Sequence, residues 1–147
     1  MRPEPRLLIG HDEQVAEWVS RTLPDHGGFA PDVRAMGVFD ASGSRILAGV
    51  VYHDYQPRFR SCAMSIASES PMFATRGTIR AMMSVPFEQY DCFKVNAMTR
   101  ADNMKAQRFL KHVGFVREAI LRHQFGPKIH GWVYGMTKPE FTARYGG

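Results

Sequence analysis

The residue types best suited to chemistry in this chain lie in a tight turn before an apolar helical pattern near its middle. The first N–H groups of a helix lack partners within the helix and lie at its positive end, so such a turn binds anions. We expect Gly77 to let an anion approach the backbone and the amides of Thr78 and Ile79 to point at it. Arg76 or Arg80 would add charge-assisted hydrogen bonds. The alternative is an ordinary helix start after a proline-bearing loop.

A second helical pattern, with an exposed polar residue at its start, follows the apolar strand pattern from Phe93 to Met98. We expect Asp102 to cap this helix by accepting a backbone N–H, and Gly114 to end it in the left-handed conformation. The apolar residues between them form one stripe at helical spacing: Ala106, Phe109, Leu110 and Val113. Asn103 stands at the mouth of the helix, where it either caps the helix or hydrogen-bonds a ligand.

The other elements are predicted from alternating apolar residues and from turn residues. Strand patterns are present at Leu7 to Ile9, Val33 to Phe39, Ile46 to Tyr52, Phe59 to Ala67, Phe115 to Phe125 and Ile129 to Met136. We expect Asp12 to cap a first helix, and Pro86 must end or kink the middle helix. The resulting order, β-α-βββ-α-β-α-ββ, predicts an α/β fold: a mixed, mostly antiparallel sheet of about seven strands flanked by helices.

Length and composition favour a single domain over residues 1–147. With 147 residues, of which 44% are hydrophobic, the chain can bury one core but is short for two ordinary domains. No apolar run reaches the roughly 20 residues that span a bilayer, and the first residues lack the apolar block of a secretion signal. We therefore expect a cytoplasmic protein with no membrane partner.

Cysteine, histidine and charge narrow the choice of ligands. Cys62 and Cys92 lie in or beside apolar strand patterns, as small buried thiols do. The six histidines show no H-x-x-x-H or H-x-H spacing, so we expect no metal. The net charge of +5 suits an anionic partner, either a phosphorylated cofactor or a nucleic acid, and is also ordinary for a solvated surface.

Together these features resemble the GNAT family of acyl-coenzyme A dependent N-acetyltransferases. The family's motif residues are matched here by Asn103, Ala106, Gly114, Phe115, Glu118 and Arg122. The motif is most similar to that of the branch that acetylates the N-termini of ribosomal proteins. The resemblance implies a GNAT fold along nearly the whole chain, acetyl-CoA as cofactor, and an acceptor that is a small-molecule amine or a protein N-terminus.

The resemblance also implies which residues hold the cofactor. Asn103 would hydrogen-bond the pantetheine arm, and the arm's amides would pair with the backbone of three strand residues: Ile66, Ala67 and Ser68. The turn described above would hold the pyrophosphate. The chain departs from the family's Q/R-x-x-G-x-G/A signature at Ala74 and Ile79, and Leu110 stands where many relatives carry a tyrosine that protonates the leaving thiolate.

Acetyl transfer needs a neutral amine, a polarised thioester carbonyl and a proton for the leaving thiolate. Glu69 is our first candidate for the base, acting directly or through water; its alternative is a surface carboxylate before a Ser-Pro turn. His53 and Tyr55 would line the acceptor side, although an edge-strand histidine and a partly buried tyrosine explain them equally well. Because no Gly-x-Ser-x-Gly elbow is present, we expect direct attack by the amine rather than a covalent acyl-enzyme.

Two other functions stay open. The departures at Ala74, Ile79 and Leu110 are compatible with a catalytically degenerate domain of the same fold that binds a protein or acyl-CoA as a sensor. A nucleic-acid-binding module is supported only by the charge and lacks interleaved aromatic and basic residues, so we expect no nucleic acid. An exposed edge in the last hairpin, with Trp132 and Tyr134 on one side, would allow two copies to pair.

Overall fold

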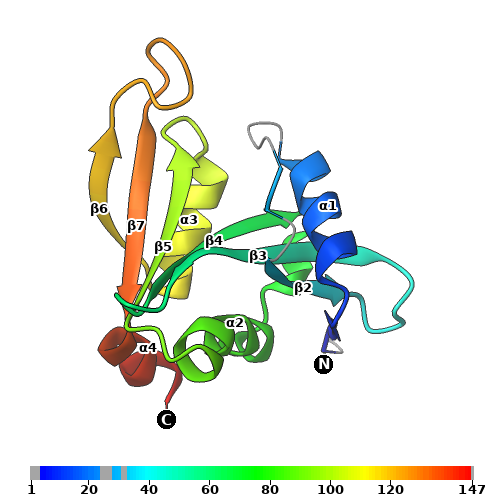
Figure 1. The fold of residues 1–147 in the computed structure, drawn as a ribbon. Coiled ribbons are helices and arrows are strands. Elements are labelled where there is room, and N and C mark those ends of the chain that lie inside the picture. Colours follow the sequence, from blue (N-terminus) through cyan, green and yellow to red (C-terminus); the bar gives the residue numbers. More distant parts are fainter. Residues whose placement is uncertain (1–3, 24–27, 31–32, 147) are drawn as a thin grey trace. The chain divides into compact units, whose positions relative to one another are not determined.

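The computed structural model describes residues 4–23, 28–30 and 33–146. Its strands are β1 (Arg6–Ile9), β2 (Arg34–Phe39), β3 (Ile46–Gln56), β4 (Ser61–Ser68), β5 (Lys94–Arg100), β6 (Val116–Leu121) and β7 (Gly131–Thr137). Its helices are α1 (Asp12–Thr22), α2 (Arg76–Ser84), α3 (Met104–Val113) and α4 (Lys138–Tyr145). The strands form one sheet in the order β1-β2-β3-β4-β5-β7-β6, which confirms the predicted mixed α/β class (Figure 1).

The described chain forms two compact units. The first, which we call unit 1, contains the residues up to Asp54 together with Met64–Val85. The second, unit 2, contains Tyr55–Ala63 together with the residues from Pro86 on.

Unit 1 begins with the antiparallel strands β1, β2 and β3. The turn between β2 and β3 is closed by Asp40, whose carboxylate accepts a hydrogen bond from the Ser42 hydroxyl at 2.9 Å and from the Ser44 amide at 3.0 Å. These bonds hold the pKa of Asp40 below its usual value, since they favour the charged carboxylate. The turn thus joins β2 and β3 as an antiparallel hairpin.

Helix α1 packs closely on one face of this hairpin because the strands carry glycines there. A Cβ on Gly49 would lie 2.7 Å from Val19 Cγ2, and one on Gly37 would lie 3.3 Å from Val15 Cγ2. The buried cluster between helix and sheet consists of Val15, Ala16, Val19, Ala35, Val51 and Ala67. Asp12 does not cap α1 as predicted: it is the first residue of the helix, and its carboxylate accepts a hydrogen bond from the Ala35 amide at 2.8 Å, which ties the helix to β2.

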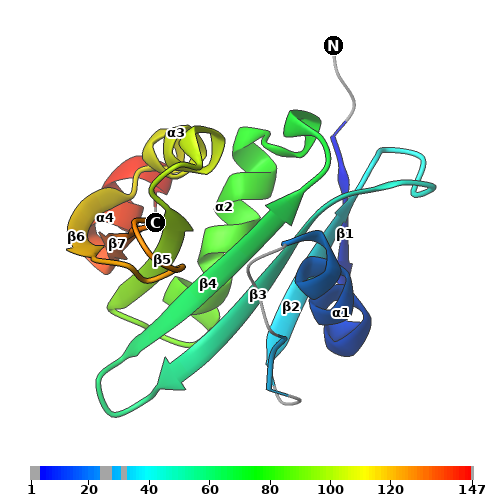
Figure 2. The same ribbon diagram turned by 90° about the horizontal axis from the view of Figure 1, so that it is seen from above.

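Helix α2 lies on the opposite face of β2 and β3 from α1, as both views show (Figures 1 and 2). Its buried residues are Thr78, Ile79, Met82 and Met83. The Tyr52 hydroxyl, which is buried, donates to the Met82 carbonyl at 2.7 Å and so satisfies a polar group in this layer. The helix ends at Ser84, before Pro86, and the chain continues through a π-helical turn at Val85–Gln89.

Unit 2 is built around the antiparallel strands β5, β7 and β6, with α3 covering one face (Figure 1). Gly114 ends α3 at φ 119°, and its amide donates to the carbonyls of Leu110 and Lys111, so the predicted left-handed stop is confirmed. Strand β6 is shorter than predicted and ends at Leu121. His123 has a φ of 57°, in the left-handed region, and this conformation is incompatible with a continuing strand.

A fourth helix, α4, follows β7 and was not predicted. Thr137 and Glu140 form a capping box, with the Glu140 carboxylate accepting from the Thr137 amide at 2.9 Å. Phe141 stacks on Phe87 with ring centroids 5.0 Å apart, and the Tyr145 hydroxyl donates to the Val113 carbonyl. These contacts fix α4 against the rest of unit 2.

The two cysteines also lie in unit 2, and both are buried and reduced. Burial raises the pKa of the Cys62 thiol far above its ordinary value, and it raises the pKa of Cys92 as well. The interpretation of both as core thiols is confirmed.

Candidate functional site

The predicted anion-binding turn is present at the start of α2, but its hydrogen bonds differ from those expected. Thr75 is the N-cap: its Oγ1 accepts from the Thr78 amide at 3.2 Å, and its carbonyl accepts from the Ile79 amide at 2.9 Å. We predicted that these two amides would point at a ligand, and that prediction is wrong, because the helix uses both for its own first turn. The exposed part of the turn is Arg76 and Gly77.

A carboxylate already lies at this positive helix end. The Thr75 hydroxyl donates to Glu4 Oε2 at 2.8 Å, and the same oxygen is 3.5 Å from the position of a Cβ on Gly77. Glu4 thus stands in for the anion that a helix N-terminus attracts. A pyrophosphate fits the charge preference of this position, and it would have to displace the Glu4 side chain to reach Gly77.

The strand residues predicted to pair with the cofactor lie at the end of β4. Ala67 is buried in the α1 cluster, and Ile66 and Ser68 are half-buried. The amide of Glu69 donates to the Leu47 carbonyl at 2.9 Å, which fixes the backbone just after the strand. The Glu69 side chain is exposed, and in the part of the chain that the structure describes no group holds its carboxylate.

His53, one of the two predicted acceptor-side residues, lies in a chain of hydrogen bonds within unit 1. Its Nδ1 is 2.9 Å from Asp54 Oδ2, and its Nε2 is 2.9 Å from Ser65 Oγ on β4. The ring also contacts Phe29, with centroids 5.5 Å apart. The contact with Asp54 could not be predicted from the strand pattern, because neighbouring residues on a regular strand point to opposite faces.

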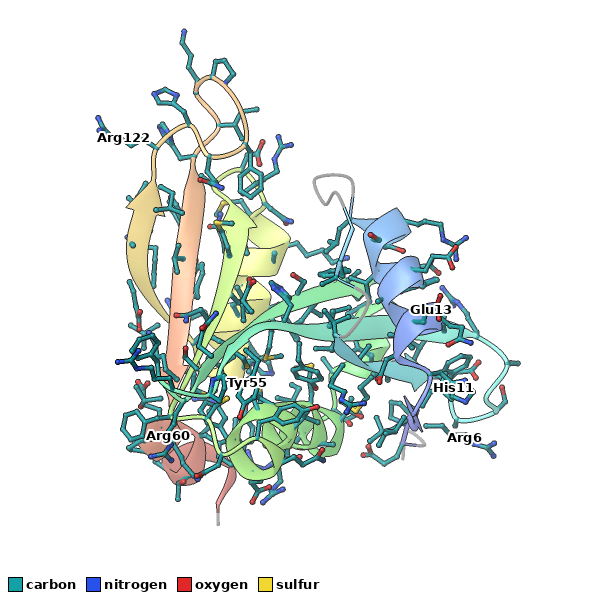
Figure 3. The ribbon with its side chains drawn as sticks, in the orientation of Figure 1. Arg6, His11, Glu13, Tyr55, Arg60 and Arg122 are labelled. Atoms are coloured by element: carbon teal, nitrogen blue, oxygen red, sulfur yellow. The ribbon has the colours of Figure 1, made fainter. Side chains whose placement is uncertain are left out.

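Tyr55, the other acceptor-side candidate, belongs to unit 2. Its ring contacts that of Tyr90 at 5.5 Å between centroids, and its side chain is exposed. Tyr55 and Arg60 flank the turn between β3 and β4 (Figure 3). Asp91 anchors this turn, since its Oδ1 is 3.1 Å from Arg60 Nη2 and 2.7 Å from Lys138 Nζ. The two cations lower the pKa of Asp91, with the Lys138 hydrogen bond the largest cause.

Asn103 caps α3, with its Oδ1 accepting from the Ala106 amide at 3.1 Å. The predicted cap, Asp102, instead forms a bidentate pair with Arg100 at 2.8 and 2.9 Å, which lowers the pKa of Asp102. Asn103 is exposed and can still donate through Nδ2, because its cap uses only Oδ1. Asn103 therefore caps α3 through Oδ1, and its Nδ2 can donate to a ligand.

Of the other motif residues, Glu118 is held by Lys94, with Nζ 2.7 Å from Oε1. Arg122 follows the end of β6 and projects away from the strands (Figure 3). Leu110 is buried in the stripe of α3, so this position supplies packing. Within the described ranges we find no cluster of histidine, cysteine or carboxylate residues suited to a metal ion, and no helix long and apolar enough to cross a membrane.

No protein-family model matches this chain, and no curated protein sequence matches it. Solved structures do match. The spermidine/spermine N-acetyltransferase SpeG from Vibrio cholerae has a TM-score of 0.72 and 15% identity, with 96% of each chain covered. The ribosomal-protein-S5-alanine acetyltransferase from Vibrio fischeri has a TM-score of 0.63 and 15% identity over 74% of this chain.

This chain spans 63% of the length of the Vibrio fischeri protein, and 64% of the length of three other matched chains. It covers almost all of SpeG. The property that the chain shares with these proteins is the fold of the GNAT acetyltransferases, and the fold predicted from the sequence motifs is confirmed.

Proposed function

We propose that this chain is an acetyl-CoA dependent N-acetyltransferase that acts on a primary amine. The observation that carries the proposal is the start of α2, where the carboxylate of Glu4 lies against the exposed Gly77 in a chain with an acetyltransferase fold. A fold alone hosts many functions, so the site has to supply the argument. Here the site supplies a positive helix end, the guanidinium of Arg76 and access to the backbone at Gly77.

In this proposal Arg76 and Gly77 hold the cofactor's phosphates, and Arg80, one turn further along α2, adds positive charge. The backbone at the end of β4, from Ile66 to Ser68, pairs with the pantetheine amides. When bound, acetyl-CoA supplies the acyl carbon and a thiol leaving group. The protein's own task is then to bind the amine, remove a proton from it and exclude water.

The acceptor class is proposed more broadly than the cofactor. The matched proteins are named for spermidine and for the alanine of a ribosomal protein, which are a polyamine and a protein N-terminus. Both present a primary amine, and the sequence motif favours the N-terminal class. We therefore propose these two amines as the first acceptors to test.

The test has two stages. Thermal denaturation with acetyl-CoA comes first, because a ligand at 100 times its Kd stabilises the folded state by about 2.7 kcal/mol. Release of free thiol is then measured with spermidine and with an alanine-initiated peptide. The proposal predicts both a thermal shift and amine-dependent thiol release.

Each negative result has a distinct meaning. The absence of a thermal shift at millimolar acetyl-CoA would overturn the proposal. A shift without transfer to any amine of a broad panel would instead identify a binding or sensor domain of the same fold.

A further inference from the structure

We propose that Ser65, His53 and Asp54 form a proton relay that removes a proton from the acceptor amine. The three side chains form a continuous chain in unit 1, with both links 2.9 Å long. The relay rests on the proposed function, and it identifies the groups that move the proton in that reaction. It replaces Glu69, our candidate from the sequence.

The direction of the relay follows from the chemistry of its end group. An ionised carboxylate has no proton to donate, so the 2.9 Å contact requires His53 Nδ1 to carry the proton and Asp54 to accept it. In a neutral imidazole the other nitrogen, Nε2, is then an acceptor. The Ser65 hydroxyl must therefore donate to Nε2, and its oxygen lone pairs are left to accept a proton from a substrate.

The backbone at Asp54 is bent in a way that creates this contact. Consecutive side chains on a strand point to opposite faces, so His53 and Asp54 would not meet in regular β-structure. Asp54 has a φ of 52°, in the left-handed region that non-glycine residues rarely adopt. Such conformations persist where the surrounding structure imposes them, and they cluster at functional sites.

The surroundings of His53 suit a group that holds a proton briefly. Its side chain is 20% exposed, while that of Asp54 is 78% exposed. Phe29 covers part of the ring, and Ser65 on the neighbouring strand is half-buried and uncharged. Among the described residues, Arg34, whose Cα partner on β3 is Tyr52, and Asp12 of α1 are charged groups near this end of β3, and these two pair with each other at 3.4 Å.

The relay balances protons as follows. The substrate ammonium gives one proton to Ser65 Oγ while the Ser65 hydroxyl proton passes to His53 Nε2, which becomes an imidazolium facing Asp54. The neutral amine then forms its N–C bond as the C–S bond of the acyl donor breaks. The second nitrogen proton goes to the departing thiolate, and His53 later returns its proton to solvent.

Glu69 lacks the features that make this chain of residues suited to proton transfer. Its carboxylate is exposed, and among the described residues no side chain orients it. A positioned base contributes about 10²- to 10⁴-fold to the rate. Because no described side chain orients Glu69, Glu69→Gln tests this candidate against the relay: a loss of kcat/KM equal to that of His53→Gln would favour Glu69 as the base and overturn the relay.

The experiment measures kcat/KM between pH 6 and pH 9.5 for the wild type and four variants: Ser65→Ala, His53→Gln, Asp54→Asn and Glu69→Gln. The probe is an alanine-initiated peptide, whose α-amino pKa is about 7.7 to 8.0. Below pH 7 we expect Ser65→Ala and His53→Gln to lose about 100-fold, with Glu69→Gln close to wild type. Above pH 9 the loss should shrink to a few-fold, because the free amine no longer needs a base.

Asp54→Asn tests the positioning role, and nuclear magnetic resonance tests it without turnover. Nitrogen shifts of His53 in the wild type should show the tautomer protonated on Nδ1, and Asp54→Asn should mix the two tautomers while the fold is unchanged. A His53 protonated on Nε2 would overturn the relay and leave the proposed function untouched.

Two kinetic outcomes would also overturn it: a loss that does not change with pH, or full activity of Ser65→Ala. An acetylated Ser65 found by mass spectrometry would overturn it as well, because it would make Ser65 a nucleophile. Wild-type protein that neither binds acetyl-CoA nor releases thiol would overturn the relay together with the proposed function.

Discussion

Glu4 and Thr75, 71 residues apart in the sequence, are joined by a hydrogen bond of 2.8 Å at the start of α2. The bond places a carboxylate at the end of the helix where backbone N–H groups give a positive potential. It follows that unit 1 stabilises its own N-terminal segment with the same field that would attract a phosphorylated ligand. The ligand and Glu4 then compete for one position.

Glu4→Gln should therefore bind acetyl-CoA more tightly than the wild type. A charge at a helix end is worth about 0.3 to 1 kcal/mol, so we expect Kd to fall about two- to fivefold. Isothermal titration calorimetry measures the change. Glu13→Gln, an exposed carboxylate on α1, is the matched control and should leave Kd as it is (Figure 3). Equal or weaker binding by Glu4→Gln would show that the carboxylate does not compete with the cofactor.

Gly77→Ala should separate stability from binding. Among the described residues, a Cβ at this position meets only Glu4, at 3.5 Å, and alanine in place of glycine stabilises a helix by about 0.5 to 1 kcal/mol. The same methyl group would keep phosphates away from the backbone, and loss of one charge-assisted hydrogen bond of about 1.5 kcal/mol weakens binding roughly tenfold. We expect a higher Tm and a higher Kd in the same variant.

Ser84→Ala provides the comparison for this result. Ser84 lies in the last turn of α2, where its hydroxyl donates to the Ala81 carbonyl, so alanine changes helix propensity far from the turn. Its Kd should equal that of the wild type. If both variants bind acetyl-CoA normally, the phosphates do not bind at Gly77.

The sequence predicted the elements that have a repeating apolar pattern and a clear stop. The stripe of α3 and the glycine at position 114 are such a case. Helix α4 was missed because only Phe141 and Tyr145 are buried in it, which is too few for a stripe. Its start does carry a local signal, the capping box between Thr137 and Glu140, and that signal would have located the helix.

The site was predicted less completely than the fold, for two physical reasons. The amide of Ile79 lies four residues after the N-cap Thr75, so the helix bonds it to the Thr75 carbonyl. It is therefore not available to a ligand. The contacts of Glu4 and of Ser65 depend on tertiary structure and on strand register. No local pattern indicates such contacts.

Thr137→Ala should reduce the free energy of unfolding by about 1 kcal/mol, because it removes the N-cap side chain of α4 and the capping box. Urea denaturation followed by circular dichroism measures this. Thr142→Ala, an exposed threonine within α4, is the control and should change stability by no more than about 0.5 kcal/mol. An equal effect of the two substitutions would mean that the cap contributes nothing particular.

The lowered pKa of Asp91, in unit 2, predicts that the stability of the protein depends on pH. Lys138 and Arg60 hold its pKa in the folded protein below the ordinary value of 3.8. A carboxyl group with a lowered folded pKa stabilises the protein above its unfolded pKa, and this contribution is lost as pH falls through the folded pKa. The Tm of the wild type should thus exceed that of Asp91→Asn at pH 6, and the difference should shrink below about pH 4.

Salt should reduce this Tm difference as well, because the Asp91 carboxylate is exposed and its charge is screened. A Tm difference that stayed constant from pH 6 to pH 2 would show that Asp91 acts through its hydrogen-bond geometry and not through its charge.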